Sequence, residues 1–182
     1  TASGNVFSHG GAIYTSCNLT VIDSTFKNTI GRGSNCFGGA IYTTGNVVVS
    51  NSTFTNTTIS RGSGGAIYIR SGSVTVSDST FTNTKTESNG GAIYSDSGSV
   101  TVTGSTFTNT TSTQSGGGAI FGGSDVSVSN STFTNTKTGD SGAIYGHKVT
   151  VINSTFKDTT AQGGGGGGAI YGGDGGVTVL NS

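Results

Sequence analysis

The stretch GGAIYTTGNVVVSNSTFTNT, residues 38–57, contains the two phrases that decide the fold. Gly-Gly-Ala-Ile followed by an aromatic residue recurs at spacings of 24 to 28 residues, with Ser141 replacing the first Gly of the sixth copy. Val-x-Val, a short polar step and Ser-Thr-Phe-x-Asn/Asp-Thr lie between these copies. Short β-type runs alternate here with joints rich in Gly, Ser and Asn. The sequence therefore predicts an all-β, right-handed parallel β-helix (β-solenoid) of about seven coils, roughly 26 residues each, as one domain over residues 1–182.

Alternation along the strands predicts the core. The Ile after Gly-Gly-Ala, the outer Val residues of Val-x-Val and the Phe of Ser-Thr-Phe are expected to point inward. Val49 and Phe54 are an odd number of residues apart, so a corner is expected at Ser50-Asn51-Ser52. About three short strands per coil, stacked at about 4.8 Å, would form ladders of like residues. The core ladders are expected at Ile13, Ile41, Ile67, Ile93, Ile120, Ile144 and Ile170, and at Phe26, Phe54, Phe81, Phe107, Phe133 and Phe156.

A polar ladder is expected beside the Phe ladder. The Asn or Asp two residues after each Phe has inward parity and could hydrogen-bond along the axis. Its members are Asn28, Asn56, Asn83, Asn109, Asn135 and Asp158. The Thr before each Phe and the Thr after each Asn or Asp would then point outward. The Thr between the Phe and the Asn, at Thr55, Thr82, Thr108 and Thr134, would do the same. The two flanking Thr ranks are Thr25, Thr53, Thr80, Thr106, Thr132 and Thr155, and Thr29, Thr57, Thr84, Thr110, Thr136 and Thr159.

An aromatic row follows the Ile ladder by one residue and should point outward by alternation. An exposed apolar stripe of this length is expected to pack on a neighbouring rod, on a flanking loop or on a ligand. The row consists of Tyr14, Tyr42, Tyr68, Tyr94, Phe121, Tyr145 and Tyr171.

The composition excludes several classes of partner. Eight Lys and Arg balance eight Asp and Glu, so there is no basic stripe for nucleic acid. No apolar run approaches the roughly 20 residues of a transmembrane helix. The chain contains no Met, so Thr1 is not a translation start, and the sequence is expected to be a processed product or a window of a longer protein.

The acidic and His residues do not form a catalytic pattern. Asp23 and Asp78 share a corner position with Asn51, and His9 and His147 have no Cys or acid at ligand spacing. Paired carboxylates or a metal cluster on neighbouring coils would be needed for an enzymatic β-helix. We therefore expect no catalytic residue, metal or cofactor.

The two phrases resemble the repeats of the chlamydial polymorphic membrane proteins, with their Gly-Gly-Ala-Ile and Phe-x-x-Asn motifs. The resemblance implies a right-handed β-helical passenger domain used in adhesion. This chain departs from the family in having Phe-x-Asn-Thr, as at Phe54-Thr55-Asn56-Thr57.

Two covalent modifications are suggested by the sequence. Asn51, Asn130 and Asn153 begin Asn-x-Ser/Thr sequons at an exposed corner and are candidates for N-glycosylation, whereas the sequons at Asn56 and Asn109 should face inward. A secreted chain would normally pair its cysteines, but stacking would put Cys17 and Cys36 on different corners. The sequence does not decide whether Cys17 and Cys36 form a disulfide.

The ending VTVLNS, residues 177–182, matches VTVINSTF at 149–156 when it is continued into the beginning TASGN. We expect the last coil to be completed by residues 1–5 of the next copy, giving a head-to-tail homopolymer. A window of a longer tandem-repeat protein would show the same pattern. The residues of the joint would be Thr1, Ala2, Asn5, Val177, Val179, Asn181 and Ser182.

The sequence thus predicts a non-enzymatic, extracellular or cell-surface structural filament subunit with an adhesive surface, open to lateral bundling or to binding of host or surface glycans. An adhesin passenger segment of a longer cell-surface protein is the first alternative. An ice-binding β-solenoid that uses its Thr ranks is the second.

Overall fold

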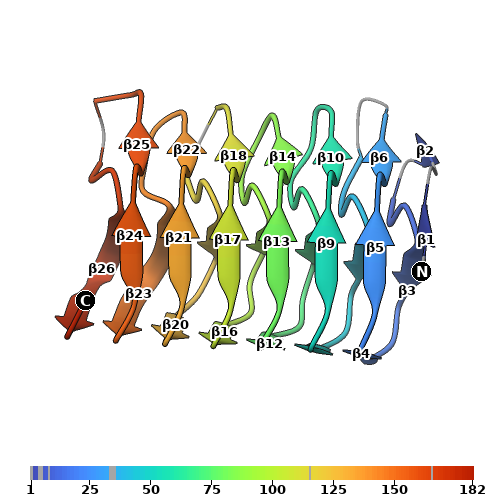
Figure 1. The fold of residues 1–182 in the computed structure, drawn as a ribbon, viewed down its shortest axis with the longest axis horizontal. Helices are drawn as coiled ribbons and strands as arrows, with labels where there is room; N and C mark the ends of the chain where they lie inside the picture. The colour runs from blue at the N-terminus through green and yellow to red at the C-terminus, as the bar shows by residue number, and fades with distance from the viewer. Residues whose placement is uncertain (1, 4–5, 8, 33–35, 115, 165) are drawn as a thin grey trace.

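The chain winds into a rod of parallel strands in the computed structural model, which describes residues 2–3, 6–7, 9–32, 36–114, 116–164 and 166–182 (Figure 1). Strands on the near face run upward, the return strands lie behind them, and each turn moves the chain from the N-terminal towards the C-terminal end. This sense is right-handed, as expected for parallel crossovers. Six full turns separate the first Gly-Gly-Ala-Ile from the last. The prediction of a right-handed parallel β-helix is confirmed.

Each turn has four strand positions, one more than the sequence predicted. The first is the Phe strand, and its seven copies form one parallel sheet. These copies are β1 (Ala2–Ser3), β5 (Thr25–Lys27), β9 (Thr53–Thr55), β13 (Thr80–Thr82), β17 (Thr106–Thr108), β21 (Thr132–Thr134) and β24 (Thr155–Lys157).

The second strand of each turn has two residues and lies between the Asn-Thr of the Phe phrase and the next Gly-Gly, where the sequence predicted no strand. It was missed because so short a strand shows no periodicity. Its copies form a second seven-stranded sheet. They are β2 (Val6–Phe7), β6 (Ile30–Gly31), β10 (Thr58–Ile59), β14 (Lys85–Thr86), β18 (Thr111–Ser112), β22 (Lys137–Thr138) and β25 (Thr160–Ala161).

The Ile and Val strands complete the turn and belong to one sheet, because in the last two turns a single strand runs through both positions. The continuous strands are β23 (Ile144–Ile152) and β26 (Ile170–Leu180). The separate Ile strands are β3 (Ile13–Thr15), β7 (Ile41–Thr43), β11 (Ile67–Ile69), β15 (Ile93–Ser95) and β19 (Ile120–Gly122). The separate Val strands are β4 (Leu19–Ile22), β8 (Val47–Ser50), β12 (Val74–Ser77), β16 (Val100–Thr103) and β20 (Val126–Ser129).

The core consists of stacked identical side chains. Each Ile strand pairs Ile with Ile, and each Phe strand from β5 onward pairs Phe with Phe. The Phe rings lie parallel, with centroids 4.7 to 4.8 Å apart. The four central rings are completely buried, at Phe54, Phe81, Phe107 and Phe133.

The predicted Asn ladder exists but faces solvent, which corrects the expectation that it points inward. Its backbone is left-handed, with φ between 53° and 56° from Asn28 to Asp158, and this conformation interrupts the alternation of the strand. All six side chains, Asn28, Asn56, Asn83, Asn109, Asn135 and Asp158, are exposed. From Asn56 to Asn135, each Nδ2 donates to the Oδ1 of the preceding coil at 2.8 to 3.0 Å.

The Thr after each of these left-handed residues turns inward instead. Thr29, Thr57, Thr84, Thr110 and Thr136 are buried, so this Thr rank is not on the outer surface as predicted. Thr110 Oγ1 donates to Thr136 Oγ1 at 3.2 Å. The outer face of the Phe sheet therefore carries two Thr ranks rather than three.

A buried Ser ladder was not foreseen. The corner at Ser50-Asn51-Ser52 has a left-handed Asn51, φ 48°, and the Ser after each such corner points inward. Each of these Ser N–H groups donates to the Ser Oγ of the following coil at 3.0 to 3.1 Å, from Ser24 to Ser182. Each Oγ in turn donates to the carbonyl two residues earlier. The buried hydroxyls are thereby satisfied, which explains the strict Ser before Thr-Phe.

Phe81→Ala tests the Phe ladder. Phe81 is fully buried between Phe54 and Phe107, with ring centroids 4.8 Å from each. We expect the free energy of unfolding to fall by about 3–5 kcal/mol, because the truncation leaves a cavity. Urea denaturation measures this. Thr82→Ala, on the outer face of the same strand, should change stability by less than about 0.5 kcal/mol; equal effects of the two variants would contradict the assignment.

Candidate functional site

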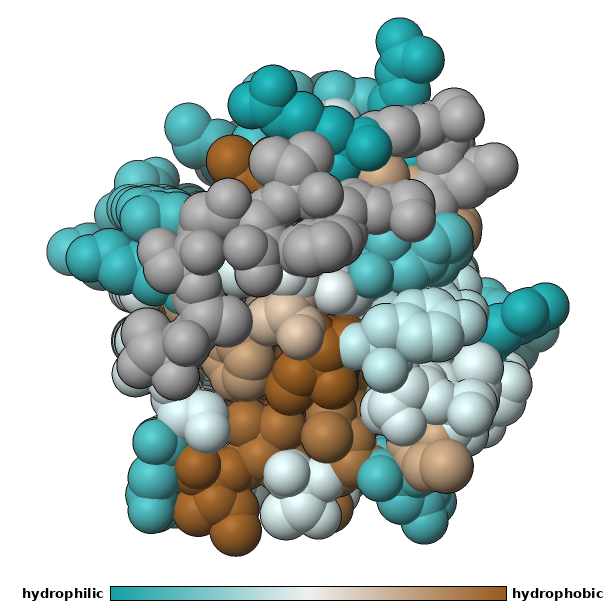
Figure 2. All heavy atoms as spheres, turned by 90° about the vertical axis from the view of Figure 1, so that its right-hand side faces the viewer, coloured by the Kyte–Doolittle hydropathy of each residue, from teal (hydrophilic) through white to brown (hydrophobic). Residues whose placement is uncertain are grey.

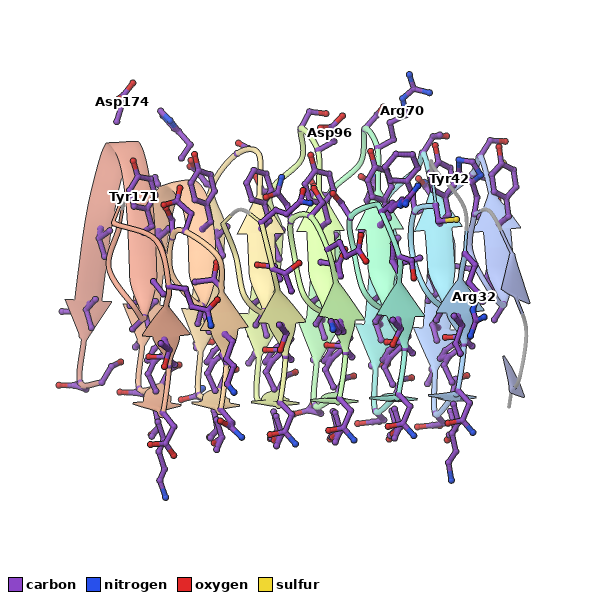
Figure 3. All side chains as sticks on the ribbon, turned by 90° about the horizontal axis from the view of Figure 1, so that it is seen from above. Arg32, Tyr42, Arg70, Asp96, Tyr171 and Asp174 are labelled. Atoms are coloured by element: carbon purple, nitrogen blue, oxygen red, sulfur yellow. The ribbon has the colours of Figure 1, made fainter. Side chains whose placement is uncertain are left out.

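The aromatic row forms a continuous stack along the rod. Its seven rings, from Tyr14 to Tyr171, are separated by 4.6 to 5.3 Å and are parallel within 15°. Figure 3 shows Tyr42, Arg70, Asp96, Tyr171 and Asp174 along one edge of the rod.

Flanking loops cover part of this row. Tyr14 is 66% exposed, but Tyr42 and Tyr68 are buried. His9 lies 5.2 Å from the ring of Tyr42, and Phe37 lies 4.6 Å from the ring of Tyr68. The sequence predicted that the row packs on a neighbouring rod, on a flanking loop or on a ligand. The structure shows packing on flanking loops.

Two tyrosines in this row have shifted pKa values. Burial raises the pKa of Tyr68 from its ordinary value of 10.0 to about 12. Burial also raises the pKa of Tyr94, and a hydrogen bond adds to the effect, because Tyr94 Oη donates to Asp96 Oδ1 at 3.0 Å. Both groups stay protonated in the folded chain well above neutral pH.

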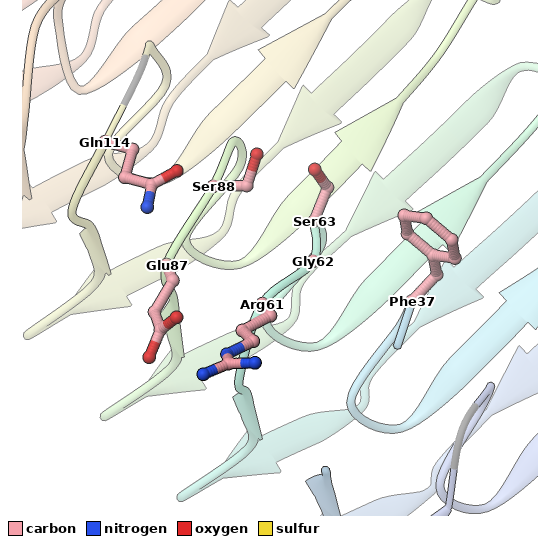
Figure 4. Close-up of a pocket in the computed structure, with 7 residues that line it drawn as sticks. All are labelled: Phe37, Arg61, Gly62, Ser63, Glu87, Ser88 and Gln114. Carbon is pink, nitrogen blue, oxygen red and sulfur yellow. The ribbon is translucent and has the colours of Figure 1, made fainter. Parts of the chain in front are cut away.

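A polar groove opens between the loops that follow the two-residue strands (Figure 4). Its volume is about 310 Å³. Figure 4 shows the side chains arranged around it, and they come from four successive turns. The lining residues are Phe37, Arg61, Gly62, Ser63, Glu87, Ser88 and Gln114. We refer to it as the loop groove.

A second groove, of about 350 Å³, lies beside the C-terminal half of the aromatic row. It opens where Gly123 stands two residues after Phe121, whereas Asp96 and His147 hold that position in the neighbouring turns. The lining residues are Phe121, Gly123, Tyr145, His147, Tyr171, Gly173 and Asp174.

Both ends of the rod expose core positions. Val177 and Val179 of β26 are 47% and 46% exposed, although their register partners Val149 and Val151 are buried. Leu180 is also exposed, but it lies at the outward-facing position of the strand, in register with the partly exposed Ile152. At the N-terminal end, Figure 2 shows a hydrophobic area bordered by hydrophilic side chains.

The proposed joint can be followed in part. β1 pairs Ala2 with Phe26, so the small Ala2 stands at a Phe position. Asn181 has the left-handed corner conformation, φ 52°, and Ser182 Oγ accepts the N–H of Ser154 at 3.0 Å. Thr1 and Asn5 lie outside the described residues.

The outer face of the Phe sheet carries a regular Thr array. Register pairs align Thr53, Thr80, Thr106 and Thr132 in one rank, and Thr55, Thr82, Thr108 and Thr134 in another. The second rank is bounded by Lys27 and Lys157 in the turns before and after it. The face therefore has four turns of uninterrupted Thr-x-Thr.

The model of the right-handed β-helix region family matches residues 49–182. The chain belongs to this family. The match begins within β8 and includes every later turn. Comparison with curated proteins gave no match, and comparison with solved structures gave none either. A right-handed β-helix is consistent with a structural domain or an adhesin-like passenger domain.

The polar residues of this β-helix do not gather into a metal site in the part that the structure describes, where no three His, Cys, Asp or Glu side chains cluster. No helix in that part is long and apolar enough to cross a bilayer.

The cysteines lie at different corners, and no disulfide joins them among the described residues. Gly45 stacks on exposed Cys17 in the turn between the Ile and Val strands, whereas Gly62 stacks on buried Cys36 in the loop before the Ile strand. Stacked coils hold the two corners apart.

The three candidate glycosylation sites, Asn51, Asn130 and Asn153, are exposed at left-handed corners. Asn153 Nδ2 donates to Asn130 Oδ1 at 3.4 Å. Asn56 and Asn109 are also exposed, contrary to expectation, because they belong to the outer Asn ladder. N-glycosylation of these residues stays a prediction.

The tyrosine pKa shifts predict a loss of stability in alkali. At pH values below 10.0, the ordinary pKa, Tyr68 and Tyr94 are protonated in both folded and unfolded chains. As pH rises above this value, the unfolded chain loses these protons first, so the free energy of unfolding falls until the folded pKa is passed. Tyr94→Phe should reduce this alkaline loss in urea denaturation, whereas Thr82→Ala, which removes no titratable group, should leave it unchanged. The same pH dependence in wild type and Tyr94→Phe would refute the prediction.

Proposed function

We propose that this β-helix is a non-enzymatic, extracellular structural rod whose copies stack head to tail into a filament. The observation that carries the proposal is the exposed face of the last coil. It presents Val177 and Val179 in register with the buried Val149 and Val151 of the turn before it.

Hydrophobic burial supplies the driving force. A further coil placed on β26 would cover Val177 and Val179, as β26 itself covers Val149 and Val151. Full burial of one such side chain is worth about 1.5–3 kcal/mol. The new coil would also pair the strand edge that β26 leaves open, as every inner strand is paired.

The register at both ends supports a second copy as the occupant. If β1 of the next copy followed Ser182, Ala2 would continue the Phe strand, because Ala2 already pairs with Phe26. The Ser182 N–H of one copy would then meet Ser24 Oγ of the next, which continues the Ser ladder.

This contact is heterologous and does not close on itself, so it generates a filament. Seven repeats at the coil spacing of about 4.8 Å give an axial rise of roughly 34 Å per chain.

The surface composition and the repeat motifs support both the extracellular location and the adhesin alternative. The surface is rich in Thr, Ser and Asn, and six sequons are exposed, at Asn18, Asn51, Asn56, Asn109, Asn130 and Asn153. The repeats resemble those of the chlamydial polymorphic membrane proteins, in which such a rod would be the passenger of a longer cell-surface chain. In that case another coil of the same chain covers β26, and the natural protein has an intact mass above 17.9 kDa. The aromatic row could also serve as a contact surface through which rods bundle side by side.

Val179→Asp tests end-to-end stacking. Val179 is 46% exposed at the end of the rod, and Val48 is 44% exposed on its side, so Val48→Asp is a matched control. Burying an unpaired carboxylate at the joint is strongly unfavourable. We expect filaments of the wild type and of Val48→Asp in electron microscopy, and monomers of Val179→Asp. Filaments that survive Val179→Asp, or a wild type that stays monomeric, would sink the proposal.

Ice binding is a second candidate, and the two-rank Thr array favours it. The array is uncharged over four turns and in register along the rod. Such a surface can hold ordered water through hydroxyls and methyl groups.

Thr82→Lys with Thr108→Lys tests this candidate. The charged side chains should abolish ice shaping and thermal hysteresis, and Thr101→Lys, exposed on β16, should not. If the wild type shows no hysteresis, ice binding is excluded.

A further inference from the structure

In the loop groove the repeat is broken in side-chain chemistry, and the loops that form it differ in length. Ile59, Thr86 and Ser112 are aligned in the two-residue strands. Two positions later in the three turns stand Arg61, Ser88 and Gln114, which all line the groove. The core ladders repeat one residue type per position, so the change from guanidinium to hydroxyl to amide is not required by stacking.

The backbone at Arg61 supports a role beyond folding. Its φ is 61°, and among the described non-Gly residues with positive φ the others are all Asn or Asp. Those residue types tolerate the left-handed region, whereas Arg does not gain the same local hydrogen bonds there. Strained residues of this kind are retained at ligand-binding positions.

The walls of the groove are held by hydrogen bonds. Thr86 Oγ1 and the Ser88 N–H both donate to the carbonyl of Gly62, the second at 3.2 Å. Thr113 Oγ1 donates to the carbonyl of Glu87 at 3.2 Å. The loops of successive turns therefore support one another, and the groove is preformed.

The side chains of the groove suit a ligand that carries hydroxyl groups. Arg61 offers only donors, Glu87 only acceptors, and Gln114 both. Ser63 and Ser88 add hydroxyls, and Phe37 supplies an apolar ring. A sugar presents neighbouring hydroxyls that donate and accept, together with an apolar face of C–H groups that packs on an aromatic ring. The volume of about 310 Å³ is at the lower end for small-molecule sites.

We propose that the loop groove binds a neutral saccharide. The formal charges of Arg61 and Glu87 cancel, which favours a neutral sugar over an acidic one. Glu87 is the one carboxylate among the described lining residues, and glycoside hydrolysis ordinarily needs two. The groove is therefore a binding site rather than a hydrolytic one, and it does not depend on filament assembly.

Saturation-transfer NMR and calorimetry on the purified chain test the proposal. The probes are lactose, maltotriose and tri-N-acetylchitotriose as neutral saccharides, and a heparin tetrasaccharide as the acidic comparison. At least one neutral probe should bind. Glu87→Gln should weaken it about tenfold, because a hydrogen bond to a charged group is lost.

Arg61→Gly is the second variant, since Gly adopts a φ of 61° freely and the fold should be kept. It should weaken the same neutral probe about tenfold as well. Arg70→Ala removes an exposed Arg outside the groove and should bind like the wild type. The proposal is overturned if no neutral probe binds, if only the heparin fragment binds, or if Glu87→Gln and an Arg61→Gly variant with a native circular dichroism spectrum both bind normally.

Discussion

The whole molecule depends on the parallel hydrogen-bond ladder that holds each turn above the last at one strand spacing. Because the spacing is constant, every side chain meets its own equivalent in the next turn, and a residue type that packs well on itself can be repeated. Phe rings show this directly, with centroids 4.7 to 4.8 Å apart through the core. A chain with 30% hydrophobic residues can therefore fill its core, since the rod is only a few side chains wide.

The corners set which residues reach that core. Left-handed residues at Asn51 and Asn56 turn the chain on either side of each Phe strand, and they do so in nearly every turn. Asn and Asp are used because their short polar side chains tolerate this conformation. Each corner also reverses the facing of the next residue, so Ser52 and Thr57 enter the interior although both are polar. The Ser hydroxyls are satisfied by the ladder, whereas Thr57 Oγ1 has no hydrogen-bond partner among the described residues.

The sequence was sufficient to predict which side chains point inward where strict alternation applies. Ile67, Phe81 and Val76 all point inward as expected, because each lies inside a regular strand. It was insufficient just after the left-handed residues, since parity counting assumes an unbroken strand and therefore placed Asn56 inside and Thr57 outside. The loop groove was also beyond reach: Arg61, Glu87 and Gln114 are more than 20 residues apart in sequence. They meet because loops of different length happen to align, which no local pattern records.

The buried Ser ladder gives the rod a chemical direction. Every Ser N–H in it points to the turn that follows, and none of these bonds runs the other way. The surface Asn ladder runs opposite, with each amide donating to the turn before. The two faces that close such a rod are therefore not interchangeable. Two N-terminal faces or two C-terminal faces brought together would continue neither ladder with its own equivalent, so both ladders favour polar over antipolar contact.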